Sequence, residues 1–320
     1  MARGRRRRLW QTDRICQPGR RVLTVMAATT ESLRQIDLSP VHAEAGFNLS
    51  SLIGWNQTAQ DWRFVLARGD GVGLLDADET LVATAMALPY GRFAWICLVL
   101  VAPDYRRQGI ATRLMDEVVA RQAAAGRVPG LDATPDGRTV YRRIGFRDVY
   151  RLGRYRGESV AAAPEAPDVL PGLLRDELRV RPLAAADLAR IAAVDRGLFG
   201  ADRMELLFHL RRRQPGAAFG AWREGRLAGY ALARNGREAT QLGPLAAIDD
   251  TVAQSLAAAA LDAVAGPVYI DVAETRADFI AWLEASGFAL QRPYIRMVRG
   301  REAGFGDPAW LYAIAGPELG

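Results

Sequence analysis

Residues 95–111, WICLVLVAPDYRRQGIA, pass from a continuous apolar run through a turn into the start of a helix. The seven apolar residues at its beginning predict a strand that is buried on both faces. Gly109 and Ala111 leave little side-chain bulk where the helix begins, and the first N–H groups of a helix have no partner inside it. Because Arg106 and Arg107 add positive charge, we expect this turn to bind an anion such as phosphate or pyrophosphate.

The segments on either side of this turn alternate between strands and helices. Two of them, 71–76 and 80–88, flank a short polar turn and are expected to form a hairpin. The expected strands are 22–27, 71–76, 80–88, 95–101, 129–134 and 146–156, and the expected helices lie near 31–44, 59–67, 109–125 and 136–144. This order predicts an α/β fold.

The same order of elements begins again after residues 157–175, which are rich in Ala, Pro and Glu and are interpreted as a linker. The matching positions are Leu33 with Leu188, Leu81 with Leu227, Leu114 with Leu256, Asp132 with Asp271, and Gly145–Phe146 with Gly287–Phe288. Chance could explain any one pair, but it explains the ordered series less well. Two copies of one α/β unit are therefore the best interpretation.

The positive charge of the chain is concentrated at its beginning. The 320 residues carry a formal net charge of +6, yet residues 1–21 alone hold eight arginines and one acid. The remainder is close to neutral, which argues against a nucleic-acid-binding body. We interpret residues 1–21 as a disordered Arg-rich tail. An arginine arm that binds nucleic acid or anionic lipid is the alternative.

Composition excludes several other classes of protein. The longest apolar run, Phe93–Pro103, is shorter than the roughly 20 residues that a membrane helix needs, so no membrane partner is expected. Two cysteines cannot form a disulfide framework, and His42 and His209 stand apart, so no metal site is expected. A reduced, cytoplasmic setting follows. Cys97 lies in an apolar strand and is expected to be a small buried hydrophobe.

Two short motifs lie on neighbouring elements of the first copy. The segment Val101-Ala-Pro103 leads into Arg106-x-x-Gly109-x-Ala111, and residues 141–146 read Tyr-Arg-Arg-Ile-Gly-Phe. Together they resemble the signatures of the GNAT superfamily, the GCN5-related N-acetyltransferases. That family usually has Asn at the position of Thr134 and often Ala at that of Gly137, so one cofactor contact differs here.

The whole chain is similar to bacterial two-domain proteins in which a standard GNAT domain precedes a divergent one. The resemblance implies two GNAT-like domains, 22–156 and 176–320, each with a mixed, mostly antiparallel central sheet flanked by helices. The first would be the catalytic domain.

The resemblance also implies that acetyl-CoA is the co-substrate. The strand end with Val99 and Val101 would pair with the pantetheine arm, and Tyr141 would be the general acid that protonates the leaving CoA thiolate. A packed aromatic side chain with a local hydrogen bond is the alternative for Tyr141. The residues implied in pyrophosphate binding are Arg106, Arg107, Gln108, Gly109, Ile110, Ala111 and Thr112.

The second copy differs where the first would bind acyl-CoA. The alignment places Asp249, Asp250 and Thr251 opposite Arg107, Gln108 and Gly109, and Leu283 opposite Tyr141. Carboxylates repel a pyrophosphate. We therefore expect residues 176–320 to have lost acyl-CoA binding, to pack on the first domain and to help shape the acceptor pocket.

Candidates for the acceptor side lie around the second predicted helix. Trp55, Asn56, Asp61 and Trp62 combine aromatic, amide and carboxylate groups that suit a small polar amine. A helix N-cap at Thr58 with both tryptophans in the core is the alternative.

Asp132, on the strand 129–134, is a candidate base or amine anchor. Its counterpart Asp271 in the inert copy favours a structural role that both share.

These features predict an N-acyltransferase that moves an acetyl group from acetyl-CoA to a primary amine of a small molecule or peptide. Transfer would be direct, in a ternary complex, because no Cys or Ser stands in a recognisable nucleophile setting. A non-catalytic acyl-CoA sensor is the alternative from another class, and an arginine-arm nucleic-acid binder is a third. The sequence leaves the acceptor, the acyl-chain length and the oligomeric state open.

Overall fold

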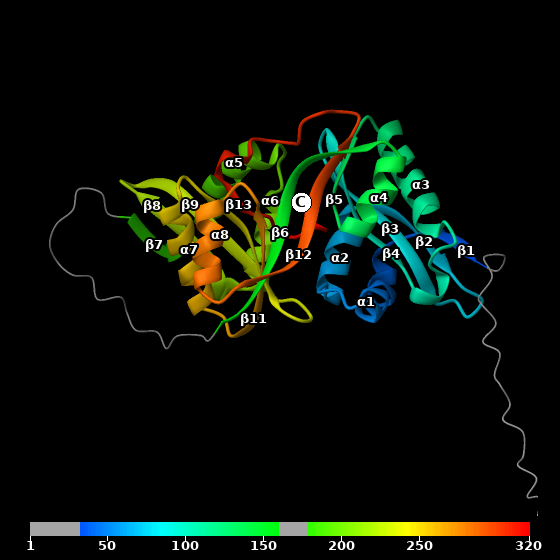
Figure 1. The fold of residues 1–320 in the computed structure, drawn as a ribbon, viewed down its shortest axis with the longest axis horizontal. Helices are drawn as coiled ribbons and strands as arrows, with labels where there is room; N and C mark the ends of the chain where they lie inside the picture. The colour runs from blue at the N-terminus through cyan, green and yellow to red at the C-terminus, as the bar shows by residue number, and fades with distance from the viewer. Residues whose placement is uncertain (1–32, 160–177) are drawn as a thin grey trace, which may run out of the picture.

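A computed structural model describes residues 33–159 and 178–320 as an elongated α/β structure built on one sheet (Figure 1). Thirteen strands of these residues follow the order β1-β2-β3-β4-β5-β12-β6-β11-β13-β10-β9-β8-β7. The pairs β4–β5 and β10–β11 are parallel, and the other pairs are antiparallel. The predicted α/β class with a mostly antiparallel sheet is confirmed.

Each half of the chain contributes strands and helices in nearly the same order. The first half contains β1 (Arg34–Asp37), α1 (Ala43–Leu52), α2 (Ala59–Arg68), β2 (Asp70–Leu75), β3 (Leu81–Tyr90), β4 (Phe93–Val101), α3 (Ile110–Ala124), β5 (Val128–Ala133), α4 (Pro135–Arg143) and β6 (Phe146–Ser159). The second half contains β7 (Leu178–Pro182), α5 (Leu188–Phe199), α6 (Met204–Arg213), β8 (Phe219–Arg223), β9 (Arg226–Arg234), β10 (Thr240–Ala247), α7 (Asp250–Asp262), β11 (Gly266–Ala273), α8 (Ala277–Ala285), β12 (Ala289–Arg299) and β13 (Leu311–Ala313).

The two halves exchange strands at the centre of the sheet. Strand β12 of the second half lies between β5 and β6 of the first, and β6 in turn pairs with β11 of the second. Figure 1 shows β6 and β12 side by side between the two lobes. Strand β6 reaches Ser159, three residues beyond the predicted strand, because its end pairs with Gly266 in β11. The sheet is therefore continuous from one half to the other.

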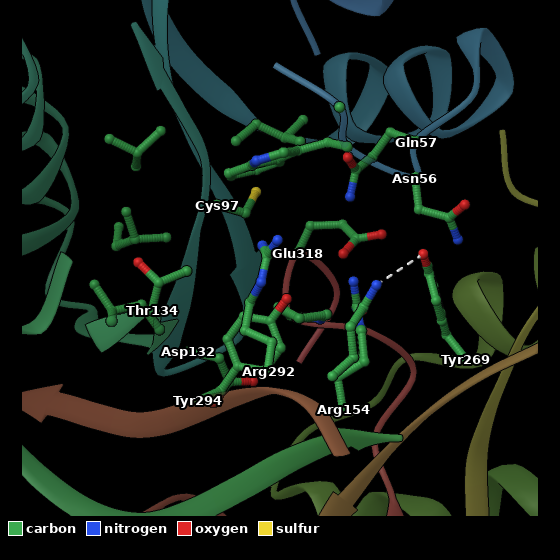
Figure 2. A pocket seen from close by; sticks show the side chains of 18 of the residues that line it. Asn56, Gln57, Cys97, Asp132, Thr134, Arg154, Tyr269, Arg292, Tyr294 and Glu318 are labelled. Carbon is green, nitrogen blue, oxygen red and sulfur yellow. Dashed lines mark hydrogen bonds between the residues drawn. The ribbon is translucent and has the colours of Figure 1, made fainter. Parts of the chain in front are cut away.

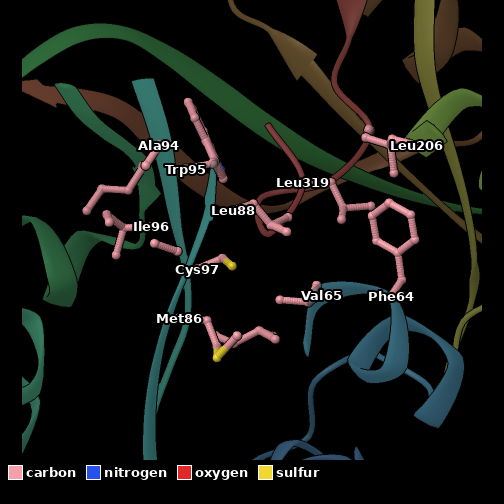
Figure 3. Close-up of a cluster of buried hydrophobic side chains, with 14 of the residues drawn as sticks. Phe64, Val65, Met86, Leu88, Ala94, Trp95, Ile96, Cys97, Leu206 and Leu319 are labelled. Atoms are coloured by element: carbon pink, nitrogen blue, oxygen red, sulfur yellow. The ribbon is translucent and has the colours of Figure 1, made fainter. Parts of the chain in front are cut away.

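The apolar core is also continuous between the halves. One cluster of buried side chains joins Trp62 and Trp95 of the first half to Leu207 and Leu319 of the second. Figure 3 shows Leu319, from the segment after β13, close to Phe64 and Leu206. Burial of apolar surface contributes about 25 cal/mol for each Å², so this shared core stabilises the contact between the halves.

The structure corrects the prediction for the start of the first half. The strand predicted at 22–27 lies outside the described residues, and the helix predicted near 31–44 is wrong. Residues 34–37 form β1, which pairs with β2, and the helix begins only at Ala43. Four residues carry no clear period of their own, so pairing with β2 decides their conformation.

One repeat match is corrected as well. Leu38 and Leu183 occupy equivalent places, because both are buried and donate their N–H to Gly71 and Ala218 of the neighbouring strand region. The match of Leu33 with Leu188 was therefore out of register. The other four pairs lie on equivalent elements of the two halves.

Candidate functional site

Strands β4 and β5 separate halfway along their length. They pair only from Phe93 to Trp95 on β4, against residues 128–130 on β5. Beyond that point β5 is paired only through its other edge, with β12. The end of β4, from Ile96 to Val99, lines a pocket with Leu131 and its neighbours. The unpaired edge of β4 can therefore accept an extended chain of ligand.

A bulge in β4 lies next to this separation. Leu98 has a φ of +48°, a left-handed conformation that costs a non-glycine residue about 1–3 kcal/mol. The register against β3 shifts between Thr84 and Met86 at the same point. The buried Thr84 hydroxyl donates a 2.7 Å hydrogen bond to the Leu98 carbonyl and holds the bulge in place.

The turn after β4 has the backbone of an anion-binding site. Arg107 and Gly109 both have positive φ, +62° and +74°. Helix α3 begins after Gly109, and no side chain caps it. Its first N–H groups therefore face outward from an exposed turn that also presents Arg106. The Arg106 side chain is anchored by a 3.0 Å hydrogen bond from Nε to the Val101 carbonyl.

The equivalent helix of the second half, α7, has a carboxylate at its start. Asp249 precedes it, and its Oδ1 accepts a 2.8 Å hydrogen bond from the N–H of Val252. Arg223 forms an ion pair with the same carboxylate. A carboxylate of the chain thus occupies the place that a pyrophosphate would need. Leu283, opposite Tyr141, is fully buried in the apolar core of this half.

Tyr141 lines the pocket from helix α4. Burial raises the pKa of its phenol to about 12, so the group stays protonated at neutral pH. Within the described parts of the chain its hydroxyl has no hydrogen-bond partner. The ring lies over Gly137, where an added Cβ would be 2.9 Å from it. Thr134, in place of the usual Asn, caps α4 by accepting from the N–H of Gly137.

The pocket is formed by both halves of the chain (Figure 2). Asn56, Gln57 and Cys97 enter from the first half, and Tyr269 and Glu318 from the second. The strands β6 and β12 add a further group of polar side chains, which are Arg154, Gln291, Arg292 and Tyr294. The cavity holds about 130 Å³, close to the space that a benzene-sized molecule fills in a protein interior.

Two of the predicted acceptor residues line this pocket. Trp55 is half-buried beside it. Asn56 is buried, donates to the carbonyl of Ala239 and accepts from the N–H groups of Glu238 and Ala239. The side chain of Asn56 therefore fixes the loop of the second half that closes one side of the pocket.

The other two predicted acceptor residues lie elsewhere, which corrects that prediction. Asp61 closes a capping box with Thr58 and forms ion pairs with Arg213 and Arg234. Burial alone would raise the pKa of Asp61, but the two guanidinium groups hold it below its ordinary value. Trp62 is fully buried in the core. The N-cap at Thr58 is confirmed, but of the two tryptophans only Trp62 is a buried core residue.

Asp132 lines the pocket, but both of its oxygens are engaged. Arg296 of β12 donates two hydrogen bonds of 2.9 Å to this carboxylate. Burial raises the pKa of Asp132, although Arg296 opposes the shift. Asp271 of the second half is held in the same way by Arg154 of β6. The two ion pairs join the exchanged strands, and this geometry favours the shared structural role.

Sequence reasoning missed the pocket residues of the second half. Glu318 reaches the pocket because its segment crosses onto the first half: Trp95 donates to the carbonyl of Pro317, and Tyr90 to that of Leu319. Nothing in the local sequence marks Glu318, since its position depends on contacts more than 200 residues apart.

The described residues contain neither a cluster of metal ligands nor a membrane-spanning helix. Within residues 33–159 and 178–320, no three His, Cys, Asp or Glu side chains gather in a way that could hold a metal ion. Among the helices of those residues, none is long and apolar enough to cross a membrane.

Comparison with known proteins identifies the family. Residues 41–146 match the acetyltransferase (GNAT) family, and residues 191–313 match a second acetyltransferase (GNAT) domain. The chain therefore belongs to the GNAT N-acetyltransferases and contains two GNAT domains. The resemblance inferred from the two motifs is confirmed.

Several proteins of the family are similar over most of the chain. YitH of Bacillus subtilis, an uncharacterized N-acetyltransferase, is 24% identical over 238 residues, which are 74% of this chain and 81% of that protein. A putative acetyltransferase from Pyrococcus horikoshii has a TM-score of 0.70 at 20% identity, covering 91% of this chain and 97% of its own. A tandem GNAT protein from the clavulanic acid biosynthesis pathway has a TM-score of 0.57 at 16% identity and covers 86% of this chain and 100% of its own. The two structural likenesses show the fold.

Proposed function

We propose that this chain transfers an acetyl group from acetyl-CoA to a primary amine held in the pocket between the halves. The observation that carries the proposal is the uncapped start of α3 beside the open edge of β4. The pyrophosphate would bind the backbone N–H groups from Gln108 to Thr112, with Arg106 and Arg107 nearby. The pantetheine arm would extend along β4 between Val99 and Val101.

In the proposed reaction, the amine nitrogen attacks the thioester carbonyl and the carbon–sulfur bond breaks. The sulfur gains a proton from Tyr141, and the amine nitrogen loses one proton to water. A phenol with a pKa near 12 is protonated at neutral pH, so its proton is present when the thiolate forms. The expected setting is still the reduced cytoplasm. In the described residues Cys97 is a free, buried thiol.

The proposal is tested by incubating the protein with acetyl-CoA and a library of amines. Release of free thiol, together with an acetylated product in mass spectra, is the expected result. Gly109→Glu should abolish both turnover and acetyl-CoA binding, because it places bulk and negative charge at the start of α3. Thr251→Glu, at the aligned and exposed position in α7, is the matched control and should change neither.

The outcomes also separate the rival functions. Acetyl-CoA binding without turnover on any amine would favour a sensor, and normal cofactor affinity in Gly109→Glu would refute the anion site. The arginine-arm hypothesis concerns residues 1–21, which lie outside the described residues. It requires DNA affinity that is lost when those residues are deleted.

A further inference from the structure

Four polar groups that line the pocket lack partners in the described residues. The buried Gln57 has an Oε1 with no hydrogen bond. Glu318 is also buried and uses Oε1 for an ion pair with Arg234, which leaves Oε2 free. On the opposite side, Arg154 has no partner for Nη1, and Arg292 forms no hydrogen bond or ion pair.

These groups divide into two kinds, which are hydrogen-bond acceptors and hydrogen-bond donors. Figure 2 shows Gln57 on the side of the first-half helices, Arg154 and Arg292 on the strand side, and Glu318 between them. Gln57 and Glu318 offer oxygens that can only accept. The two arginines offer N–H groups that can only donate. The complementary ligand has a donor at one end and an acceptor at the other.

The charges favour an anion at the acceptor end. Each pocket carboxylate already has a cation: Asp132 pairs with Arg296, Glu238 with Arg237, and Glu318 with Arg234. The unpaired guanidinium of Arg292 therefore leaves a residual positive charge in the pocket. A neutral or purely cationic amine would leave that charge without a partner.

Arg154 is held rigidly for such a contact. Its Nε and Nη2 each donate a 2.8 Å hydrogen bond to Asp271. Its guanidinium lies 4.9 Å from the ring centre of Tyr269 and 5.3 Å from that of Tyr294. A fixed, planar group with N–H donors left over matches a carboxylate better than a hydrated lysine would.

We propose that the acceptor is a compact amine that also carries a carboxylate, an amino acid or a close analogue. This inference rests on the proposed acetyl transfer. The carboxylate binds Arg154 and Arg292, and the ammonium binds Glu318 Oε2 and Gln57 Oε1. Glu318 takes one ammonium proton, the freed nitrogen bonds to the acyl carbon, and the carbon–sulfur bond breaks. The nitrogen then loses its second proton to water as Tyr141 protonates the sulfur.

The test compares each of the 20 common amino acids with its amide and its decarboxylated amine. The expected result is at least one amino acid whose kcat/KM exceeds that of both partners tenfold or more. A second set, β-alanine, O-phosphoethanolamine and propylamine, separates carboxylate from phosphate. A tenfold preference for O-phosphoethanolamine, or equal rates for acids and decarboxylated amines, would overturn the proposal.

Variants then assign the preference to the pocket. Arg292→Gln should raise the KM of the preferred amino acid at least tenfold, while the KM of acetyl-CoA and the rate with its decarboxylated amine stay unchanged. Arg299→Gln, exposed on the same strand, is the control and should behave like the parent chain. An Arg292→Gln chain with unchanged preference would refute the carboxylate contact.

Binding of the amino acid, measured without turnover, separates failure of this inference from failure of the proposed acetyl transfer. Calorimetry should detect the preferred amino acid binding to the CoA-loaded protein, and binding should weaken at least tenfold in Arg292→Gln. If propylamine is acetylated but amino acids neither bind nor react, this inference fails and the proposed function stands. If acetyl-CoA is bound but no amine of either set or of the wider library is acetylated, both fail.

Discussion

Tyr141 is the residue whose surroundings bear most directly on chemistry. Tyr141→Phe should lower kcat about a hundredfold, because it removes the proton donor for the thiolate, and should leave acetyl-CoA affinity unchanged. Since the pKa of the phenol is about 12, the loss should be equal at pH 7 and pH 9. Steady-state kinetics at both values, with calorimetry of acetyl-CoA binding, measure this.

Leu283→Ala is the matched control in the second half. It should lower the unfolding midpoint, because Leu283 is a fully buried core residue, and leave kcat per folded molecule unchanged. If Tyr141→Phe keeps full turnover, Tyr141 is not the group that protonates the thiolate.

His209 makes the free energy of unfolding depend on pH. Burial and the neighbouring Arg213 lower its pKa to about 4, against about 6.5 in an unfolded chain. Between these values the unfolded chain binds more protons, so the contribution of His209 to stability is lost as the pH falls from 6.5 towards 4.

Urea unfolding at pH 7.5, 5.5 and 4.5 measures this effect. The stability of the parent chain relative to His209→Gln should decrease over that series. A difference that is constant with pH would show that His209 titrates normally in the folded protein.

At the scale of elements, the starts of α3 and α7 differ in a way that predicts different cofactor binding by the two halves. Gly109 leaves α3 uncapped, whereas Asp249 caps α7. A carboxylate facing a pyrophosphate in a site without water costs several kcal/mol, and about 4 kcal/mol is roughly a thousandfold in affinity. Calorimetry should therefore give one CoA for each chain. Two equivalent sites would contradict this division.

The elements also show which parts of the fold are encoded locally. Apolar runs, glycines and caps within a few residues determine the strand 95–101, the turn before α3 and helix α4. These elements could therefore be predicted from the sequence. Strand β1 has four residues and takes its conformation from β2. The position of Glu318 depends on the contact between its neighbour Pro317 and the distant Trp95. No local sequence pattern therefore predicts it.

At the scale of the whole molecule, the exchange of β6 and β12 makes the halves depend on each other. If the chain is divided within residues 160–177, the first fragment lacks the strand between β5 and β6. Each fragment expressed alone should aggregate, because unpaired strand edges and half of a shared core are exposed. Co-expression should restore a soluble complex, measured by co-purification. A first fragment that is soluble alone and binds acetyl-CoA normally would contradict this.

The same exchange sets an order of events during protein synthesis. Strand β12 leaves the ribosome well over a hundred residues after β5, a delay on the order of ten seconds at ordinary rates of elongation. Until then the first half has a gap in its sheet, and its site lacks the wall that carries Arg292. The half proposed to bind acetyl-CoA is thus translated first, but its sheet and its pocket are completed only when the second half has been synthesised.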